Sequence, residues 1–211
     1  MIGGDLLRYN KTQKYLIKDF ETEGLNLIHS RPWQVSFAVF TLEQILEIKD
    51  YYIWWDDLNI SADAARITQF DFQDYKKKAL PPKEVLEDLE KYLYNKDIKP
   101  IFHNGIGYDC MIHQVFRKQL GLKYDYSFLE RCIDTLALGR AYKKGFKPDL
   151  KNLQEWQFSM VNYREKGLKA TLGQLLKDFQ IEFDENTLHN AKSDILLNIQ
   201  VFKKLIWALE I

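Results

Sequence analysis

The first third of the chain is rich in β-forming residues, and this feature constrains the fold more than any other. Runs of alternating, β-branched and aromatic residues cover positions 15–21, 33–40 and 51–55. Only short turn-like segments separate these runs, which predicts three strands joined as an antiparallel meander. The remainder of the chain must then cover the faces of this sheet.

Beyond residue 60 the pattern changes to helices that alternate with short strands. Apolar spacing and capping residues predict helices at 61–68, 81–94, 108–120, 171–179 and 190–209, and short strands at 98–103 and 132–134. This order predicts an α/β domain over residues 1–211, with a mixed five-stranded sheet flanked by α-helices and its first three strands antiparallel. The segment 143–169 is expected to be an irregular insertion.

Composition excludes several classes of protein. The 211 residues are 46% hydrophobic, as in one globular domain, and 30 basic against 30 acidic residues exclude a strongly basic DNA coat. Cys110 and Cys132 are too few for a disulfide framework or a zinc site. The first 15 residues lack the apolar core of a signal peptide, and the longest apolar run, 33–42, is too short to span a membrane. We expect a soluble, cytoplasmic protein that has no membrane contact.

Two acidic residues occur within the first predicted strand. Asp19 and Glu21 are two positions apart, so they point to the same face as Tyr15 and Ile17. Two carboxylates beside apolar residues cost desolvation energy, which suggests a function. The alternative is that this end of the strand is simply exposed.

Two further acids lie near the starts of predicted helices, on their apolar sides. Asp109 precedes Ile112 by three residues and Phe116 by seven, and Asp194 lies beside Ile195 on the inward stripe of the last helix. The alternative for each is compensation of the helix dipole, worth about 0.3–1 kcal/mol.

If the four acids converge, they require a cation. Two like charges about 4 Å apart repel by about 4 kcal/mol at an effective dielectric constant near 20. Ligands that are all oxygen atoms favour Mg²⁺ or Mn²⁺ over zinc, and two such ions serve phosphodiester hydrolysis. His189, five residues before Asp194, can then accept a proton from water at neutral pH. The alternative for His189 is a loop or capping role.

Three motifs now occur in a fixed order. They read DFETEG at 19–24, HNGIGYD at 103–109 and HNAKSD at 189–194, with DTL at 134–136 and TLGQL at 171–175 between the second and the third. In these motifs the chain resembles the DnaQ-like 3′–5′ exonucleases of the DEDDh subgroup, which belong to the ribonuclease-H-like superfamily. The resemblance covers nearly the whole chain.

The resemblance implies a ribonuclease-H-like fold and the two-metal removal of nucleotides from a 3′ end, with release of nucleoside 5′-monophosphates. Asp19, Glu21, Asp109 and Asp194 would hold two Mg²⁺ (or Mn²⁺) ions, and His189 would be the general base.

Contacts with the substrate follow in part from the same motifs. Thr22 would lie near the terminal nucleotide, and Asn104 would support the second acid or touch the substrate. Leu25 and Tyr108 are candidates for stacking on the terminal base or wedging against it, and the alternative, which judging each residue alone favours, is a place in the core. Tyr108 stands where Phe is commoner in the family, and the added hydroxyl does not endanger the chemistry.

The segment after the fifth predicted strand is basic and contains aromatic residues. Lys143, Lys144 and Lys147 are its proposed substrate-binding residues, with Phe146 between them. Cations on phosphates and rings on bases hold single strands without reading their sequence. The insertion 143–169 would then lie on the substrate side, whereas the alternative is a solvated loop.

The expected substrate is a single-stranded or frayed 3′ end, with DNA favoured over RNA, in proofreading or end trimming. Proofreading would require a DNA polymerase in trans, because the chain contains no polymerase domain. One alternative is an RNA 3′–5′ exonuclease that trims RNA ends or degrades oligoribonucleotides. The other is a non-catalytic polymerase-accessory subunit, against which the complete set of acids argues.

Overall fold

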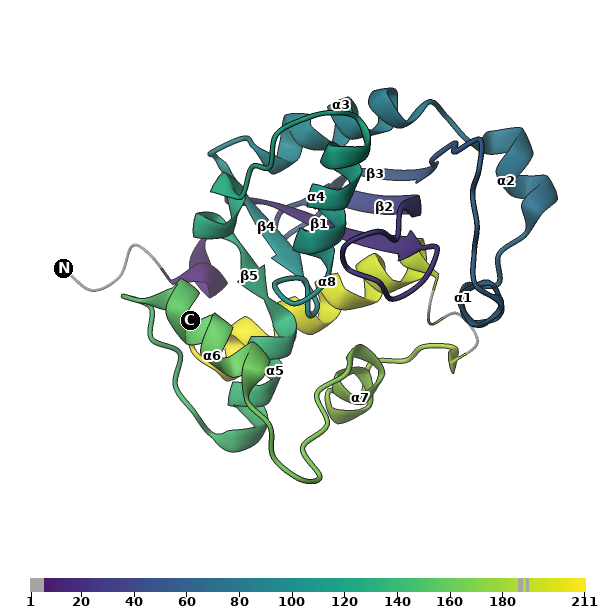
Figure 1. Cartoon of the computed structure of the whole chain (residues 1–211). Coiled ribbons are helices and arrows are strands. Elements are labelled where there is room, and N and C mark those ends of the chain that lie inside the picture. The colour runs from purple at the N-terminus through teal and green to yellow at the C-terminus, as the bar shows by residue number, and fades with distance from the viewer. Residues whose placement is uncertain (1–5, 186–187, 189) are drawn as a thin grey trace.

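A computed structural model describes residues 6–185, 188 and 190–211 of the chain. Its centre is one five-stranded sheet in the order β3-β2-β1-β4-β5 (Figure 1). The strands are β1 (Lys14–Thr22), β2 (Pro32–Phe40), β3 (Ile45–Tyr52), β4 (Ile98–Phe102) and β5 (Ile133–Asp134). The first three pair antiparallel, whereas β4 lies parallel to β1 and to β5. The predicted mixed sheet is thus confirmed.

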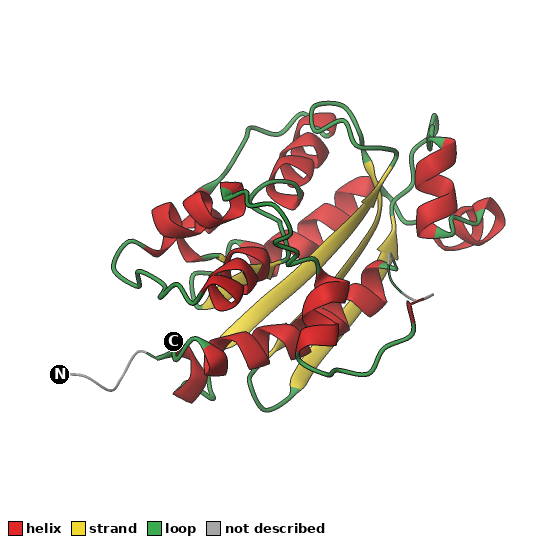
Figure 2. Ribbon diagram, turned by 90° about the horizontal axis from the view of Figure 1, so that it is seen from below, coloured by secondary structure: helices red, strands yellow, loops and turns green. Residues whose placement is uncertain are grey.

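Helices cover both faces of this sheet (Figure 2). They are α1 (Ala62–Thr68), α2 (Phe72–Lys78), α3 (Pro82–Leu93), α4 (Asp109–Gln119), α5 (Thr135–Lys144), α6 (Leu153–Asn162), α7 (Leu172–Asp178) and α8 (Ala191–Ala208), with short 3₁₀ turns at Leu7–Tyr9 and Ser127–Arg131. Side-chain caps begin several of them, as Ser61 does for α1, Thr171 for α7 and Asn190 for α8. No helix in the described ranges is long and apolar enough to cross a membrane.

Alternation along β1 divides the core into two layers. Tyr15 and Ile17 pack with residues of α5, α7 and α8 on one face of the sheet. Leu16 and Phe20 pack with residues of α3 and α4 on the other face. Because β1 lies in the middle of the sheet, residues on either of its faces are covered by helices.

The third strand lies earlier in the chain than the predicted 51–55. A tight connection pairs Phe40 directly with Ile45, and the ladder then continues to Tyr52. Beyond it Trp55 leaves the sheet, and its indole Nε1 donates to the Pro32 carbonyl at 2.7 Å. The sequence pattern was misleading because β3 is an edge strand whose charged, half-exposed residues mask its alternation.

The segment 143–169, expected to be irregular, contains helix α6. Met160 and Val161 pack against α5. The amide of Gln157 is fully buried, where its Nε2 donates to the Cys132 carbonyl at 3.1 Å and its Oε1 accepts from the Asp134 N–H at 2.7 Å. Because a polar side chain occupies the inward face of α6, the apolar pattern is too short to predict this helix.

Candidate active site

Strand β1 places its two acids at the end of the sheet where β4 also ends. Asp19 pairs with Ser36 and Glu21 with Gln34 on β2. Both carboxylates are on the same face of β1 as Ile17, as predicted, and this face is the one that α8 covers. The register shifts between Glu21 and Thr22, so regular pairing ends beside the acids.

The third acid, Asp109, is the first residue of α4 and is 4% exposed. A sharp turn between β4 and α4 delivers it to the site, and the buried Asp134 fixes this turn. Asp134 Oδ1 accepts from the N–H groups of Asn104 and Leu136, both at 2.9 Å, and its Oδ2 accepts from the Ile106 N–H at 3.1 Å. Sequence reasoning noted Asp134 as part of a family step but missed this positioning role.

Glycine is required within the same turn. A Cβ atom on Gly105 would lie 2.2 Å from the Cβ of Phe102, closer than atoms can approach. The neighbouring Asn104 adopts the left-handed conformation with φ of 62°, which Asn tolerates better than most residues. The sequence Asn-Gly thus makes the abrupt connection from strand to helix possible.

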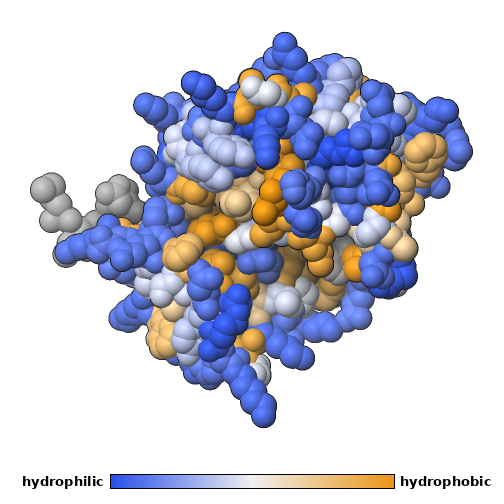
Figure 3. Space-filling view, in the orientation of Figure 1, coloured by the Kyte–Doolittle hydropathy of each residue, from blue (hydrophilic) through white to orange (hydrophobic). Residues whose placement is uncertain are grey.

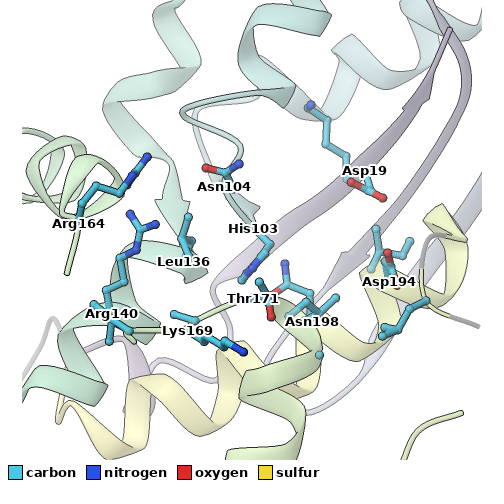
Figure 4. A pocket seen from close by; sticks show the side chains of 17 residues that line it. Asp19, His103, Asn104, Leu136, Arg140, Arg164, Lys169, Thr171, Asp194 and Asn198 are labelled. Atoms are coloured by element: carbon cyan, nitrogen blue, oxygen red, sulfur yellow. The ribbon is translucent and has the colours of Figure 1, made fainter. Parts of the chain in front are cut away.

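The fourth acid, Asp194, lies in the first turn of α8. Asn190 caps this helix by accepting from the Ser193 N–H at 3.2 Å. Asp194 and Asp19 line the same cavity, and Figure 4 shows both side chains at one end of it. The structure therefore brings together acids from β1, α4 and α8 that the sequence places far apart.

The electrostatics of the site reflect this convergence. Burial raises the pKa of Asp19 well above its ordinary value, and the charges of Asp109, Glu21 and Asp194 raise it further. Burial also raises the pKa of Glu21 to about 8, with smaller contributions from Asp194 and Asp109. Carboxyl groups that share a site in this way resist ionisation, and a bound cation would relieve their mutual repulsion.

One residue beside the acids, Lys18, was not singled out from the sequence. It lies on the opposite face of β1 and is 2% exposed, with its Nζ 3.7 Å from Asp109 Oδ1. The ammonium also lies 4.2 Å from the ring centroid of Phe20 and 4.9 Å from that of Phe102. Burial lowers the pKa of Lys18, whereas Asp109 acts in the opposite direction. The sequence signal for this buried lysine is its position in the strand, where it shares a face with the apolar residues at 16 and 20.

The donor set fits a hard divalent cation. Asp109 Oδ1 is buried and accepts no hydrogen bond from the described residues. Carboxylate oxygens are the ligands that Mg²⁺ and Mn²⁺ prefer. No three His, Cys, Asp or Glu side chains in the described ranges are already close enough together to hold an ion.

His189, the predicted general base, lies outside the described residues. Its chain neighbour Asn190 begins α8, the helix that carries Asp194. The assignment of His189 stays a prediction from the sequence.

The predicted contacts for the terminal nucleotide form a second group beside the acids. The Tyr108 hydroxyl lies 2.7 Å from Thr22 Oγ1, and both hydroxyls donate to the Gly24 carbonyl, at 3.2 and 2.7 Å. Tyr108 thus ties the start of α4 to the end of β1. Leu25 follows directly and is 88% exposed. Asn104 lines the cavity.

The three predicted substrate-binding lysines do not line this cavity. Lys143 forms an ion pair with Asp178 at 2.7 Å, and Lys144 pairs with Glu165 at 2.9 Å, beside a neighbouring hollow. Lys147 is exposed. Their role in substrate binding stays a prediction.

The cavity itself measures about 770 Å³. Its apolar lining includes Leu136, Leu168 and Leu172, and hydrophobic side chains gather near the centre of the face shown in Figure 3, with hydrophilic ones around it. His103 also lines the cavity, with its Nδ1 2.9 Å from Thr135 Oγ1. Burial lowers the pKa of His103 to about 4, so the ring is neutral at pH 7.

Comparison with known proteins identifies the fold. No protein-family model matches the sequence, and no curated protein matches it significantly. E. coli exonuclease I in complex with a dT13 oligonucleotide superposes with a TM-score of 0.71, at 18% identity over 92% of this chain and 41% of that one. The zinc-bound form of the E. coli exonuclease I–ssDNA complex superposes with a TM-score of 0.71, at 18% identity over 91% of this chain and 40% of that one. A product-bound exonuclease I structure has a TM-score of 0.69, at 17% identity over 92% of this chain and 43% of that one.

This likeness confirms the predicted resemblance at the level of the fold. The chain has the ribonuclease-H-like fold of exonuclease I. It spans about two fifths of the length of the exonuclease I chains that it matches.

Proposed function

We propose that this chain, which shares the fold of exonuclease I, is a metal-dependent 3′–5′ exonuclease. It hydrolyses phosphodiester bonds from the 3′ end of single-stranded or frayed nucleic acid, DNA in preference to RNA, and releases nucleoside 5′-monophosphates. The observation that carries the proposal is the electrostatic coupling of four acids from β1, α4 and α8, two of which, Asp19 and Asp194, line one end of a cavity.

The four acids would hold two Mg²⁺ or Mn²⁺ ions. Bound there, such ions activate water and neutralise the charge of the leaving 3′ oxygen. Asp19, Glu21, Asp109 and Asp194 supply the oxygen ligands, and His189 takes the proton of the attacking water. A buried carboxylate needs a fixed orientation to act as a ligand. The turn before α4, whose N–H groups donate to Asp134, supplies this orientation by holding the end of α4 that carries Asp109.

The terminal nucleotide is proposed to lie against the end of β1. Thr22 and Tyr108 fix the backbone there through their shared acceptor, the Gly24 carbonyl. The exposed Leu25 is placed to contact the terminal base. Asn104 lines the cavity and is placed to contact the substrate there. Lys143, Lys144 and Lys147 would contact phosphates farther along the strand.

The preference for DNA rests on the structural neighbours, which were solved with dT13 and other single-stranded DNA. An RNA 3′–5′ exonuclease is the alternative within the same chemistry. A polymerase in trans, and with it a proofreading role, remains part of the proposal. A non-catalytic accessory role is disfavoured because Asp19 and Glu21 are buried beside other carboxylates, and a bound cation would relieve this repulsion.

The test compares matched DNA and RNA oligonucleotides, single- and double-stranded, labelled at the 5′ end and incubated with Mg²⁺, Mn²⁺ or EDTA. The proposal predicts a ladder of shortened products with either metal ion and none with EDTA, most rapidly on single-stranded DNA. Faster degradation of RNA would favour the alternative substrate, whereas intact strands under every condition would contradict the proposed activity.

A further inference from the structure

The cavity that Asp19 and Asp194 line has a basic opposite end. Arg140 from α5, Arg164 beyond α6 and Lys169 before α7 line it there. Figure 4 shows the two arginine side chains across the cavity from Asp19 and Asp194. One cavity thus has two carboxylates at one end and three cations at the other.

The two guanidinium groups are held side by side by a shared acceptor. Nη1 of Arg140 donates to the Met160 carbonyl at 2.9 Å and also to the Val161 carbonyl. Nη1 of Arg164 donates to the same Val161 carbonyl at 2.8 Å and to the Tyr163 carbonyl at 3.0 Å. The end of α6 therefore fixes two like charges next to each other, and their other N–H groups donate to no acceptor in the part of the chain that the structure describes.

These cations differ from their neighbours in having no carboxylate partner. Lys143 and Lys144, on the same helix as Arg140, are both ion-paired. Neither arginine nor Lys169 has a carboxylate oxygen within 4.0 Å among residues 6–185, 188 and 190–211. Within the described residues, these three cations at the far end of the cavity thus lack the close carboxylate partners that Lys143 and Lys144 have, which is an arrangement suited to an anionic ligand.

We infer that Arg140, Arg164 and Lys169 bind a phosphate group of the substrate strand, on the 5′ side of the bond that is cleaved. The inference rests on the proposed function, because it takes the acids as the position of the 3′ end. Paired guanidinium groups suit the several oxygens of a phosphate. That phosphate is either an internal phosphodiester of a longer strand or the terminal 5′-phosphate of a short one.

The experiment measures oligothymidylate binding by calorimetry, with Ca²⁺ in place of Mg²⁺ to suppress turnover. Short and long strands, of about 4 and about 16 nucleotides, each carry a 5′-hydroxyl or a 5′-phosphate. They are titrated at several salt concentrations into the wild type, Arg164→Ala and Lys169→Ala. Lys96→Ala is the matched control, because Lys96 is an exposed lysine before β4, at the strand end away from His103.

Arg164→Ala is expected to weaken binding by about tenfold and to reduce the slope of log K against log salt by about 0.7. Lys169→Ala should change the slope similarly, and Lys96→Ala should change neither quantity. If the variants lose affinity for long strands with either 5′ group, the bound group is an internal phosphodiester. If they lose affinity only for short 5′-phosphorylated strands, the bound group is the terminal phosphate. Both variants keep the backbone contacts of Arg140, and thermal unfolding checks that they remain folded.

Wild-type affinity and salt slope in both variants on all four strands would overturn the inference, as would a wild type that binds none of them. The nuclease assay separates this result from failure of the proposed function. A wild type that binds strands through Arg164 but leaves them intact contradicts the exonuclease and supports the phosphate site. Normal cleavage by the wild type, with unchanged binding in the variants, supports the exonuclease and contradicts the phosphate site.

Discussion

Replacing Glu21 by Gln tests whether crowded carboxylates destabilise the metal-free protein. Burial, and then the charges of Asp194 and Asp109, raises the pKa of Glu21 to about 8. The folded protein therefore holds this proton more tightly than the unfolded chain, in which the ordinary value is 4.5. The stability from this group is complete below pH 4.5 and is lost as the pH rises through 8, a difference on the order of 5 kcal/mol.

Glutamine cannot ionise, so Glu21→Gln escapes this loss. In urea unfolding with EDTA, the variant should match the wild type near about pH 5 and be several kcal/mol more stable near about pH 9. The exposed Glu182→Gln is the control and should show no such divergence. Added Mg²⁺ should reverse the order at high pH, because it binds the native wild type and raises its free energy of unfolding. Equal stability of Glu21→Gln and wild type near about pH 9 in EDTA would refute the reasoning.

Three further substitutions probe the site. Asp109→Asn should abolish most nuclease activity. In urea unfolding with EDTA it should also be about 3 kcal/mol less stable than Glu21→Gln, because the buried Lys18 loses its carboxylate partner. Equal stability of the two variants would contradict this role for the ion pair. Asp134→Ala should lower the free energy of unfolding by about 2–4 kcal/mol, because three backbone N–H groups lose their acceptor, and an unchanged urea midpoint would count against this. His189→Ala should lower kcat by about 10²–10⁴-fold and leave the Kd for an oligonucleotide in Ca²⁺ nearly unchanged; wild-type kcat would show that another group takes the proton.

The sequence was most informative where periodicity and burial agree. Alternation along β1 placed Asp19 and Glu21 on the face of Ile17, and the structure has them there. Helical spacing likewise placed Asp109 and Asp194 on inward-facing stripes. These predictions hold because a central strand and two covered helices leave few other orientations for apolar residues.

Features that depend on tertiary contacts were not predictable in this way. Lys18 lies on the other face of β1, so its contact with Asp109 requires the turn after β4 to be known. Arg140 and Arg164 come together only because α6, a helix with a weak apolar pattern, returns its end to α5. Strand β3 was displaced because an edge strand has little burial to shape its sequence.

The central claim is that the acid cluster removes nucleotides from a 3′ end in a metal-dependent reaction. The most direct measurement follows one single-stranded DNA labelled separately at its 5′ and 3′ ends, with wild type and Asp19→Asn, in Mg²⁺ and in EDTA. We predict that wild type with Mg²⁺ releases the 3′ label at once as a nucleoside 5′-monophosphate, while the 5′ label moves down a ladder of shortening strands. EDTA and Asp19→Asn should each stop both events. Early release of the 5′ label as a mononucleotide, or undiminished cleavage by Asp19→Asn, would contradict the claim.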